Sequence, residues 1–158
     1  MKKRGQLEQP FIYIFALVVI AFIIFFGFSA IRKVTKLGES VSTVTFKSEL
    51  EKQVNHFYYM DTGSRGEVSL DVPLNFKYVC FADKSGVLDK FPQQDSILRN
   101  LVKTTDRNIY LLPAEGNKIE SYTIANVRGS ENPFCVLNSK GLIVFILENK
   151  GDYVEARK

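Results

Sequence analysis

The sequence predicts an α+β protein, in which an N-terminal transmembrane helix precedes a small domain with a packing helix and a mostly antiparallel β-sheet. Three observations lead to this fold class. Residues 11–31 carry no charged side chain, residues 46–60 place apolar side chains at helical spacing, and residues 67–72 alternate between polar and apolar. The expected divisions are a cytoplasmic basic tail (1–10), the transmembrane helix (11–31), a juxtamembrane linker (32–45) and an extracytoplasmic α+β domain (46–158).

The uncharged stretch 11–31 is 21 residues long. As a helix it extends about 31 Å, which matches a hydrocarbon core of about 30 Å. A helix satisfies its own backbone hydrogen bonds, so it crosses lipid without help from other segments. The alternative, a buried core helix, requires more surrounding protein than the rest of this chain supplies. The lipid bilayer is therefore the first expected partner.

The excess positive charge lies beside this stretch. Residues 1–39 carry six basic and two acidic side chains, which accounts for the whole formal net charge of +4, while residues 40–158 carry fifteen of each. Cations that flank an apolar helix meet anionic lipid headgroups, so this distribution disfavours nucleic acid as a partner. The membrane-flanking basic residues are Lys2, Lys3, Arg4, Arg32, Lys33 and Lys36.

Three basic residues lie on each side of the stretch, so the positive-inside rule favours neither orientation clearly. The expected orientation rests on the cysteines instead. Two cysteines in a small domain favour a disulfide and therefore an oxidising compartment. We expect a single-pass protein of the cell membrane, with its N-terminus in the cytoplasm and its C-terminal domain outside.

The first residues also carry a resemblance. The stretch from Lys2 to Gln6, KKRGQ, followed by a long apolar helix, resembles the class III signal of archaeal type IV pilin-like proteins. The resemblance covers about residues 1–31 and implies cleavage between Gly5 and Gln6, with the apolar helix serving as an assembly element. The sequence departs from that family at Pro10, where the family usually carries Glu.

The next helix is expected at 46–60, where Phe46, Leu50, Val54 and Phe57 form one apolar stripe. Gly38 is expected to end the first helix, because glycine is a common helix terminator. The β-branched run 41–45 disfavours helix and suits a linker. The alternative is one long stalk helix, in which apolar residues of 31–41 extend the stripe.

From residue 67 onward the pattern predicts mainly strands. Val68, Leu70 and Val72 alternate with polar residues, as a half-buried strand requires. A short amphipathic helix is expected at 95–102, with Asp95 as a possible cap. The other expected strands are 77–81, 108–112, 118–127, 134–137, 142–148 and 153–156.

Two segments echo each other around the cysteines. Cys80 and Cys135 are each followed by two apolar residues, then Asp or Asn, two polar residues, Gly and two apolar residues. This order is typical of a strand that runs into a tight turn. We predict a disulfide between Cys80 and Cys135, with their Cα atoms within about 7 Å. The alternative is a pair of buried free thiols.

The sequence carries no recognisable catalytic constellation. His56 is its one histidine and falls off the apolar stripe, and two cysteines are too few for a structural zinc site. We expect no enzyme activity, no cofactor and no metal. The expected function is a membrane-anchored domain with a structural or binding role at the cell envelope, with another envelope protein or self-association as further partners. The alternatives are a pilin-like subunit of an archaeal filament and an unrecognised envelope enzyme.

Overall fold

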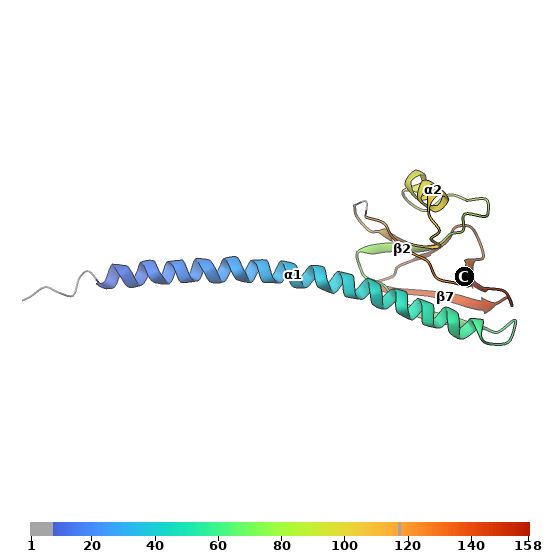
Figure 1. Cartoon of the computed structure of the whole chain (residues 1–158), viewed down its shortest axis with the longest axis horizontal. Helices are drawn as coiled ribbons and strands as arrows, with labels where there is room; N and C mark the ends of the chain where they lie inside the picture. The colour runs from blue at the N-terminus through green and yellow to red at the C-terminus, as the bar shows by residue number, and fades with distance from the viewer. Residues whose placement is uncertain (1–7, 117) are drawn as a thin grey trace, which may run out of the picture. The chain divides into compact units, whose positions relative to one another are not determined.

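The computed structural model describes residues 8–116 and 118–158, with side chains described for residues 12–28, 43–116 and 118–158. The chain divides into two compact units, Met1–Val41 and Ser42–Lys158. The boundary between the units falls inside helix α1 (Glu8–Tyr58). Figure 1 shows the helices and strands of both units.

The expected break and linker over 32–45 are wrong, because α1 is helical throughout that range. A β-branched residue lowers helix propensity by only a fraction of a kcal/mol, and tertiary packing readily offsets that amount. Thr43 and Phe46 are buried, at 5 % and 1 % exposure, so packing already begins within the expected linker. The alternative of one long helix describes the secondary structure of this segment.

The expectation of a transmembrane helix over 11–31 is corrected by the structure. In the parts of the chain that the structure describes, no helix is both long and apolar enough to cross a membrane. The described side chains here run from Ile12 to Phe28, about 26 Å of helix against a hydrocarbon core of about 30 Å. The large apolar side chains in that range are exposed, for example Phe25 at 71 %.

Within the described residues of the second unit, eight strands form two four-stranded sheets rather than one. We call them the β7 sheet, with strand order β1-β7-β8-β5, and the β2 sheet, with strand order β4-β3-β2-β6. The pairing of β5 with β8 is parallel and the other pairings are antiparallel, so the expected α+β class with mostly antiparallel strands describes this unit. The elements are β1 (Arg65–Asp71), β2 (Phe76–Phe81), α2 (Asp95–Thr104), β3 (Ile109–Pro113), β4 (Glu120–Tyr122), β5 (Val127–Gly129), β6 (Phe134–Leu137), β7 (Leu142–Asn149) and β8 (Val154–Arg157).

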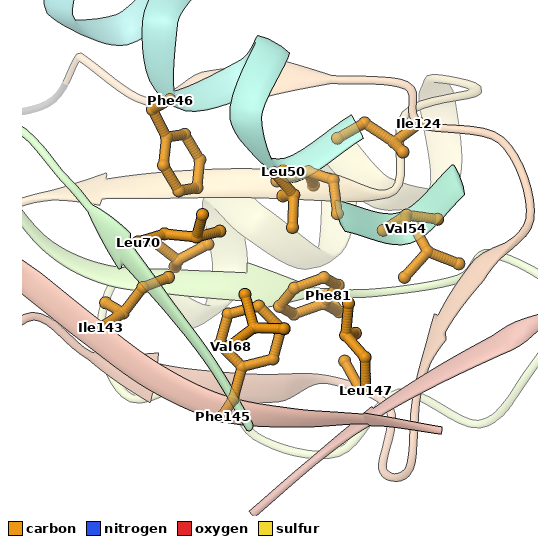
Figure 2. Packing of buried hydrophobic residues seen from close by; sticks show 14 of the residues in the cluster. Phe46, Leu50, Val54, Val68, Leu70, Phe81, Ile124, Ile143, Phe145 and Leu147 are labelled. Carbon is orange, nitrogen blue, oxygen red and sulfur yellow. The ribbon is translucent and has the colours of Figure 1, made fainter. Parts of the chain in front are cut away.

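The main hydrophobic core joins the C-terminal part of α1 to both sheets. Figure 2 shows Phe46, Leu50 and Val54 of α1 pointing into a cluster with strand side chains. Every second residue of β1 and β7 faces this cluster, because alternate side chains of a strand point to the same face of the sheet. The buried strand residues labelled in Figure 2 are Val68, Leu70, Phe81, Ile143, Phe145 and Leu147.

The β2 sheet is covered on both of its faces. Val79 and Phe81 belong to the main core, whereas Cys80 and Ala82, which alternate with them, belong to a second buried cluster. That second cluster includes Leu98 of helix α2, which has the amphipathic pattern expected for residues 95–102. Figure 1 shows α2 above β2, with β7 below β2. The near-continuous apolar run of β2 is the sequence pattern that two-sided burial produces.

A buried asparagine closes the C-terminal end of α1. Asn149, the last residue of β7, is 2 % exposed. Its amide nitrogen donates to the carbonyl oxygens of Phe57, Tyr58 and Met60 at distances of 3.0, 3.1 and 2.8 Å. The last carbonyls of a helix have no partner within the helix, so this side chain supplies the hydrogen bonds that they lack.

Candidate functional site

A polar cleft lies where strands of both sheets end in the second unit. It has a volume of about 280 Å³. It brings together the segment after β2, the segment between α2 and β3, the turn before β5, and the turn before β8. Its lining residues are Asp83, Lys84, Thr105, Asp106, Arg107, Asn108, Thr123, Asn126, Val127, Arg128, Asp152 and Tyr153.

The turn after β2 is held in place by an asparagine that is distant in sequence. The backbone N–H of Asp83 donates to Asn132 Oδ1 at 2.9 Å, and Asn132 Nδ2 donates to the Asp83 carbonyl at 2.8 Å. This pair of bonds imitates the bonds between two peptide groups. Asp83 Oδ1 also accepts the Ser85 backbone N–H at 2.9 Å, which closes the turn locally. The carboxyl of Asp83 is therefore fixed at the rim of the cleft.

A second asparagine fixes the opposite wall. Asn108 Oδ1 accepts the Ile124 backbone N–H at 2.9 Å, and Asn108 Nδ2 donates to the carbonyls of Ile124 and Val127 at 2.7 and 3.3 Å. Asn126 lies between these partners with a φ of 58°, in the left-handed region that asparagine tolerates better than most residues. The segment 123–127 is thereby held against the start of β3.

The charged side chains of the cleft are balanced. Three of its lining residues are cationic (Lys84, Arg107 and Arg128) and three are anionic (Asp83, Asp106 and Asp152). Lys84 pairs with Asp106, and Arg128 Nε lies 3.8 Å from Asp83 Oδ2. The Arg128 guanidinium also lies over the Tyr153 ring, 5.0 Å from its centroid, in a cation–π arrangement.

Two carboxyls of the cleft are held in the ionised form. The hydrogen bond from the Ser85 backbone N–H lowers the pKa of Asp83, and the Arg128 charge adds to that effect. The hydrogen bond from Lys84 lowers the pKa of Asp106. A general base works best when its pKa lies near the operating pH, so these carboxylates suit charge recognition better than proton transfer. The arrangement can bind positively or negatively charged groups.

The predicted disulfide is confirmed. Cys80 and Cys135 face each other in the β2–β6 pairing, with sulfur atoms 2.04 Å apart and Cα atoms 4.1 Å apart. Cys80 is fully buried in the second hydrophobic cluster, on the face of the β2 sheet that α2 covers. The disulfide therefore links β2 to β6, and Asp83 and Lys84 lie in the segment that follows the C-terminal end of β2.

The structure places the other predicted residues outside the cleft. His56 is exposed on α1 and its ring contacts the edge of Phe57. Lys2, Lys3, Arg4 and the possible processing site, Gly5 and Gln6, lie outside the described residues. The basic residues that follow the apolar stretch lie on α1, in a range whose side chains are not described: Arg32, Lys33 and Lys36.

Sequence reasoning missed the cleft because no local motif encodes it. The segment from Asp83 to Gly86 reads as a turn, and the segment from Asp106 to Asn108 reads as a polar connection. The two segments share one sequence feature, which is a charged residue close to the end of an apolar strand. Asp83 follows β2, and Arg107 precedes β3. Folding brings these four distant segments together to line one cleft.

Among the residues that the structure describes, no group of three or more His, Cys, Asp or Glu side chains is placed to hold a metal ion. Comparison of the chain with protein-family models, with curated proteins and with solved structures found no match.

Proposed function

We propose that this protein is a non-enzymatic component of the cell envelope, attached to the cell membrane through the apolar part of α1. In this proposal the unit Ser42–Lys158 lies outside the cytoplasm and binds or supports another envelope component. The observation that carries the proposal is the pairing of a disulfide-bonded unit with an exposed apolar helical stretch in one chain.

The disulfide supports the extracytoplasmic placement. Disulfides persist in oxidising compartments and are rare in the reducing cytosol. Cys80 is completely buried, so the bridge belongs to the folded core rather than to an exposed redox centre.

The apolar stretch supports membrane attachment. Between Ile12 and Phe28 exposed large apolar side chains occur on every face of the helix, with exposures from 38 % at Val19 to 71 % at Phe25. A helix that is apolar all round is stable only in an apolar environment. Lipid provides that environment, and the basic residues that flank the stretch suit anionic headgroups.

The polar cleft supports a binding role for the outer unit. Four of its charged side chains are already paired in the folded unit, Lys84 with Asp106 and Arg128 with Asp83, and pairing of this kind lowers the entropic cost of binding. The ionised state of Asp83 and Asp106 favours recognition of a polar partner over acid–base chemistry.

Cell fractionation combined with protease treatment tests this proposal. We expect the full chain in the membrane fraction, resistant to high salt and released by detergent. A protease that does not enter cells should digest the unit Ser42–Lys158 in intact cells. A chain that begins at Ser42 is the matched control and should leave the membrane fraction. Recovery of the full chain as a soluble cytoplasmic protein would refute the proposal.

A pilin-like subunit is the second candidate function, and two observations favour it. Helix α1 continues across Gly38, as a stalk helix of that kind requires, instead of ending there. In addition, Val18, Ala21, Phe22 and Phe25 line a shallow apolar groove on the helix, which a second helix could fill. Sheared filaments that contain the chain, with a mature N-terminus at Gln6, would establish this function in place of the first.

A further inference from the structure

One face of the β7 sheet is not covered by any described part of the chain. Ile143, Phe145 and Leu147 of β7 point into the main core (Figure 2), so the residues between them lie on the opposite face. Every side chain on that opposite face is exposed or half-exposed. We call it the open face, and its residues are Arg65, Glu67, Ser69 and Asp71 of β1, Leu142, Val144, Ile146 and Glu148 of β7, and Glu155 and Arg157 of β8.

The sequence of β7 is that of a strand buried on both faces. Its residues from Leu142 to Leu147 are all apolar, whereas an antiparallel strand with one face in water usually alternates. β2 also has successive buried residues, and its second face is covered by α2 and the second cluster. On the open face, Val144 is 46 % exposed and Leu142 is 39 % exposed. An apolar row of this kind, rimmed by polar side chains, marks a contact surface.

Two rows of side chains cross the open face beside the apolar residues, each from β1 through β7 to β8. The rows are Arg65–Glu148–Glu155 and Glu67–Ile146–Arg157. The two ends of each row carry opposite charges, and the order of the charges is reversed from one row to the other. The open face therefore has a fixed charge pattern that a partner has to match.

The charges on the β1 side of this pattern are unpaired. Lys150 Nζ lies 2.6 Å from Glu148 Oε1 and 3.4 Å from Glu155 Oε2, so the acids of β7 and β8 already have a cation. Arg65 and Glu67 are exposed and have no ion-pair partner among the residues that the structure describes. A partner that places an acid near Arg65 and a base near Glu67 would complete both rows.

We propose that the open face binds the open face of a second copy of this chain, about a two-fold axis parallel to β7. A two-fold contact brings the same surface of both copies together. Rotation about this axis exchanges the β1 side with the β8 side. Arg65 then faces Glu155 of the second copy, and Glu67 faces Arg157 of the second copy. Each pair occurs twice, so the open face matches its own charge pattern.

The same axis removes the apolar row from water. Val144 and Ile146 lie against the same residues of the second copy, as in two sheets packed face to face about 10 Å apart. A two-fold axis across the strands can also pair the charges, but it would set Ile146 against the Glu148 carboxylate of the second copy. Only the axis along β7 satisfies the apolar row and the charged rows together.

Two acids of the open face have no base of the second copy opposite them. The Glu148 carboxylates of the two copies approach each other, and each is neutralised within its own copy by Lys150 at 2.6 Å and Arg157 at 2.9 Å. Asp71 lies across from Leu142, whereas β8 ends across from Ile146, so Asp71 remains at the rim in water. Neither acid therefore prevents the contact.

The size of the open face predicts a weak dimer. Four strands about 4.8 Å apart, with up to eight residues of about 3.3 Å each, give roughly 500 Å² per copy. The contact would bury about 1,000 Å² in total, which is near the lower limit for a specific interface. The inference names a partner for the outer unit of the proposed function and needs only the unit Ser42–Lys158. Membrane attachment would strengthen the contact by raising the local concentration of the chain.

Cross-linking of the full chain in vesicles of phosphatidylcholine and phosphatidylglycerol tests the contact. The variant Val144→Cys places a thiol beside the two-fold axis, where a bismaleimide with reactive groups about 10 Å apart spans the stacked sheets. Ile97→Cys on α2, at 51 % exposure, is the matched control. Cys80 and Cys135 are joined to each other and do not react. We expect a cross-linked fraction about fivefold higher at position 144 than at position 97, because the interface holds the two thiols together.

Charge reversal on single copies tests the predicted pairs. Arg65→Glu and Glu155→Arg, each added to Val144→Cys, should lower the cross-linked fraction by about threefold, since each sets like charges against each other. An equal mixture of the R65E copy and the E155R copy should return it to about the level of Val144→Cys alone, because both pairs are then complementary. Lys103→Glu, at an exposed position on α2, is the control for charge reversal and should leave the fraction unchanged.

Flotation of the same samples separates this inference from the proposed membrane attachment. A chain that floats but cross-links equally at positions 144 and 97 overturns the inference and leaves the attachment standing. A chain that cross-links at position 144 as expected without floating overturns the attachment and supports the inference. A mixture of the R65E and E155R copies that cross-links no better than either copy alone overturns the proposed axis.

Discussion

The two sheets of the second unit differ in how many of their faces are buried. The β2 sheet is buried on both faces, by the main core on one side and by α2 with the second cluster on the other. The β7 sheet is buried on one face, and its other face carries exposed residues such as Val144 at 46 %. The burial patterns show the same difference, because three successive residues of β2 are buried whereas burial alternates along β1 and β7. In sequence only β1 alternates, since β7 is apolar from Leu142 to Leu147. The β2 sheet should therefore tolerate change far less than the outer face of the β7 sheet.

The largest effect should come from the residue that joins the two sheets. The Phe81 ring of β2 lies 5.5 Å from the Phe145 ring of β7 and 5.9 Å from the Phe134 ring of β6, measured between centroids. Phe81→Ala should lower the free energy of unfolding by about 3–5 kcal/mol, because it leaves a cavity between the sheets. Urea denaturation measures this change.

The control for Phe81→Ala lies on the open face of the β7 sheet. Val144→Thr keeps a β-branched shape at an exposed strand position and should change the free energy of unfolding by no more than about 0.5 kcal/mol. Equal losses for Phe81→Ala and Val144→Thr would contradict the distinction between the two sheets.

Removal of the disulfide should have the next largest effect. Cys80 and Cys135 are 55 residues apart, and cross-links of this kind contribute about 2–4 kcal/mol by restricting the unfolded chain. Cys80→Ala with Cys135→Ala should lower the midpoint of thermal unfolding, and reduction of the native protein should lower it to a similar extent. An intact mass that corresponds to two free thiols in the unreduced protein would contradict the bridge.

The polar connection between β7 and α1 should rank third. Asn149→Ala removes the amide that donates to Phe57, Tyr58 and Met60. Leaving buried carbonyls without partners costs about 1–3 kcal/mol, so the free energy of unfolding should fall by that amount. Hydrogen exchange should increase most at the last turn of α1. A variant with unchanged exchange at that turn would show that water replaces the amide.

The smallest effect should come from charges on the open face of the β7 sheet. The hydrogen bond from Lys150 lowers the pKa of Glu148, and Arg157 adds to this effect. A carboxyl whose pKa is lower in the folded state stabilises it above the unfolded pKa of about 4.3, and this contribution disappears as the pH falls through the folded value.

Glu148→Gln should therefore reduce the loss of stability between about pH 5 and pH 3, as measured by the urea midpoint at each pH. Glu49→Gln, at an exposed position on α1, provides the control and should follow the native pH profile. If both variants follow the native profile, the ion pairs of Glu148 contribute nothing measurable.

The sequence predicts those features that depend on local pattern. The α+β class, the strand cores and the Cys80–Cys135 bridge all follow from apolar runs, alternation and turn residues. The strand expected at 118–127 shortens to β4 (Glu120–Tyr122), because Asn126 takes a left-handed conformation and Asn108 holds the segment 123–127 as a turn. That interaction joins residues far apart in sequence, so no local pattern contains it.

The helix and the cleft illustrate the same limit. Propensity favours a linker at 41–45, and burial of Thr43 and Phe46 overrides it once the strands are in place. The cleft depends on Asn132 and Asn108, two ordinary asparagines whose partners lie up to 49 residues away. Local sequence pattern does not predict the parallel pairing of β5 with β8 either, because the two strands are far apart in the chain.

The place of β8 in the β7 sheet has a consequence for the order of events during synthesis. β8 lies between β7 and β5, although it is the last strand in the chain. The strands of the β2 sheet all precede residue 138, so the pairings of that sheet need no residue of 138–158. The β7 sheet has to wait, with β5 unpaired, until Val154–Arg157 emerge. The pairings of the β2 sheet can therefore form earlier during synthesis than the pairing of β5 with β8.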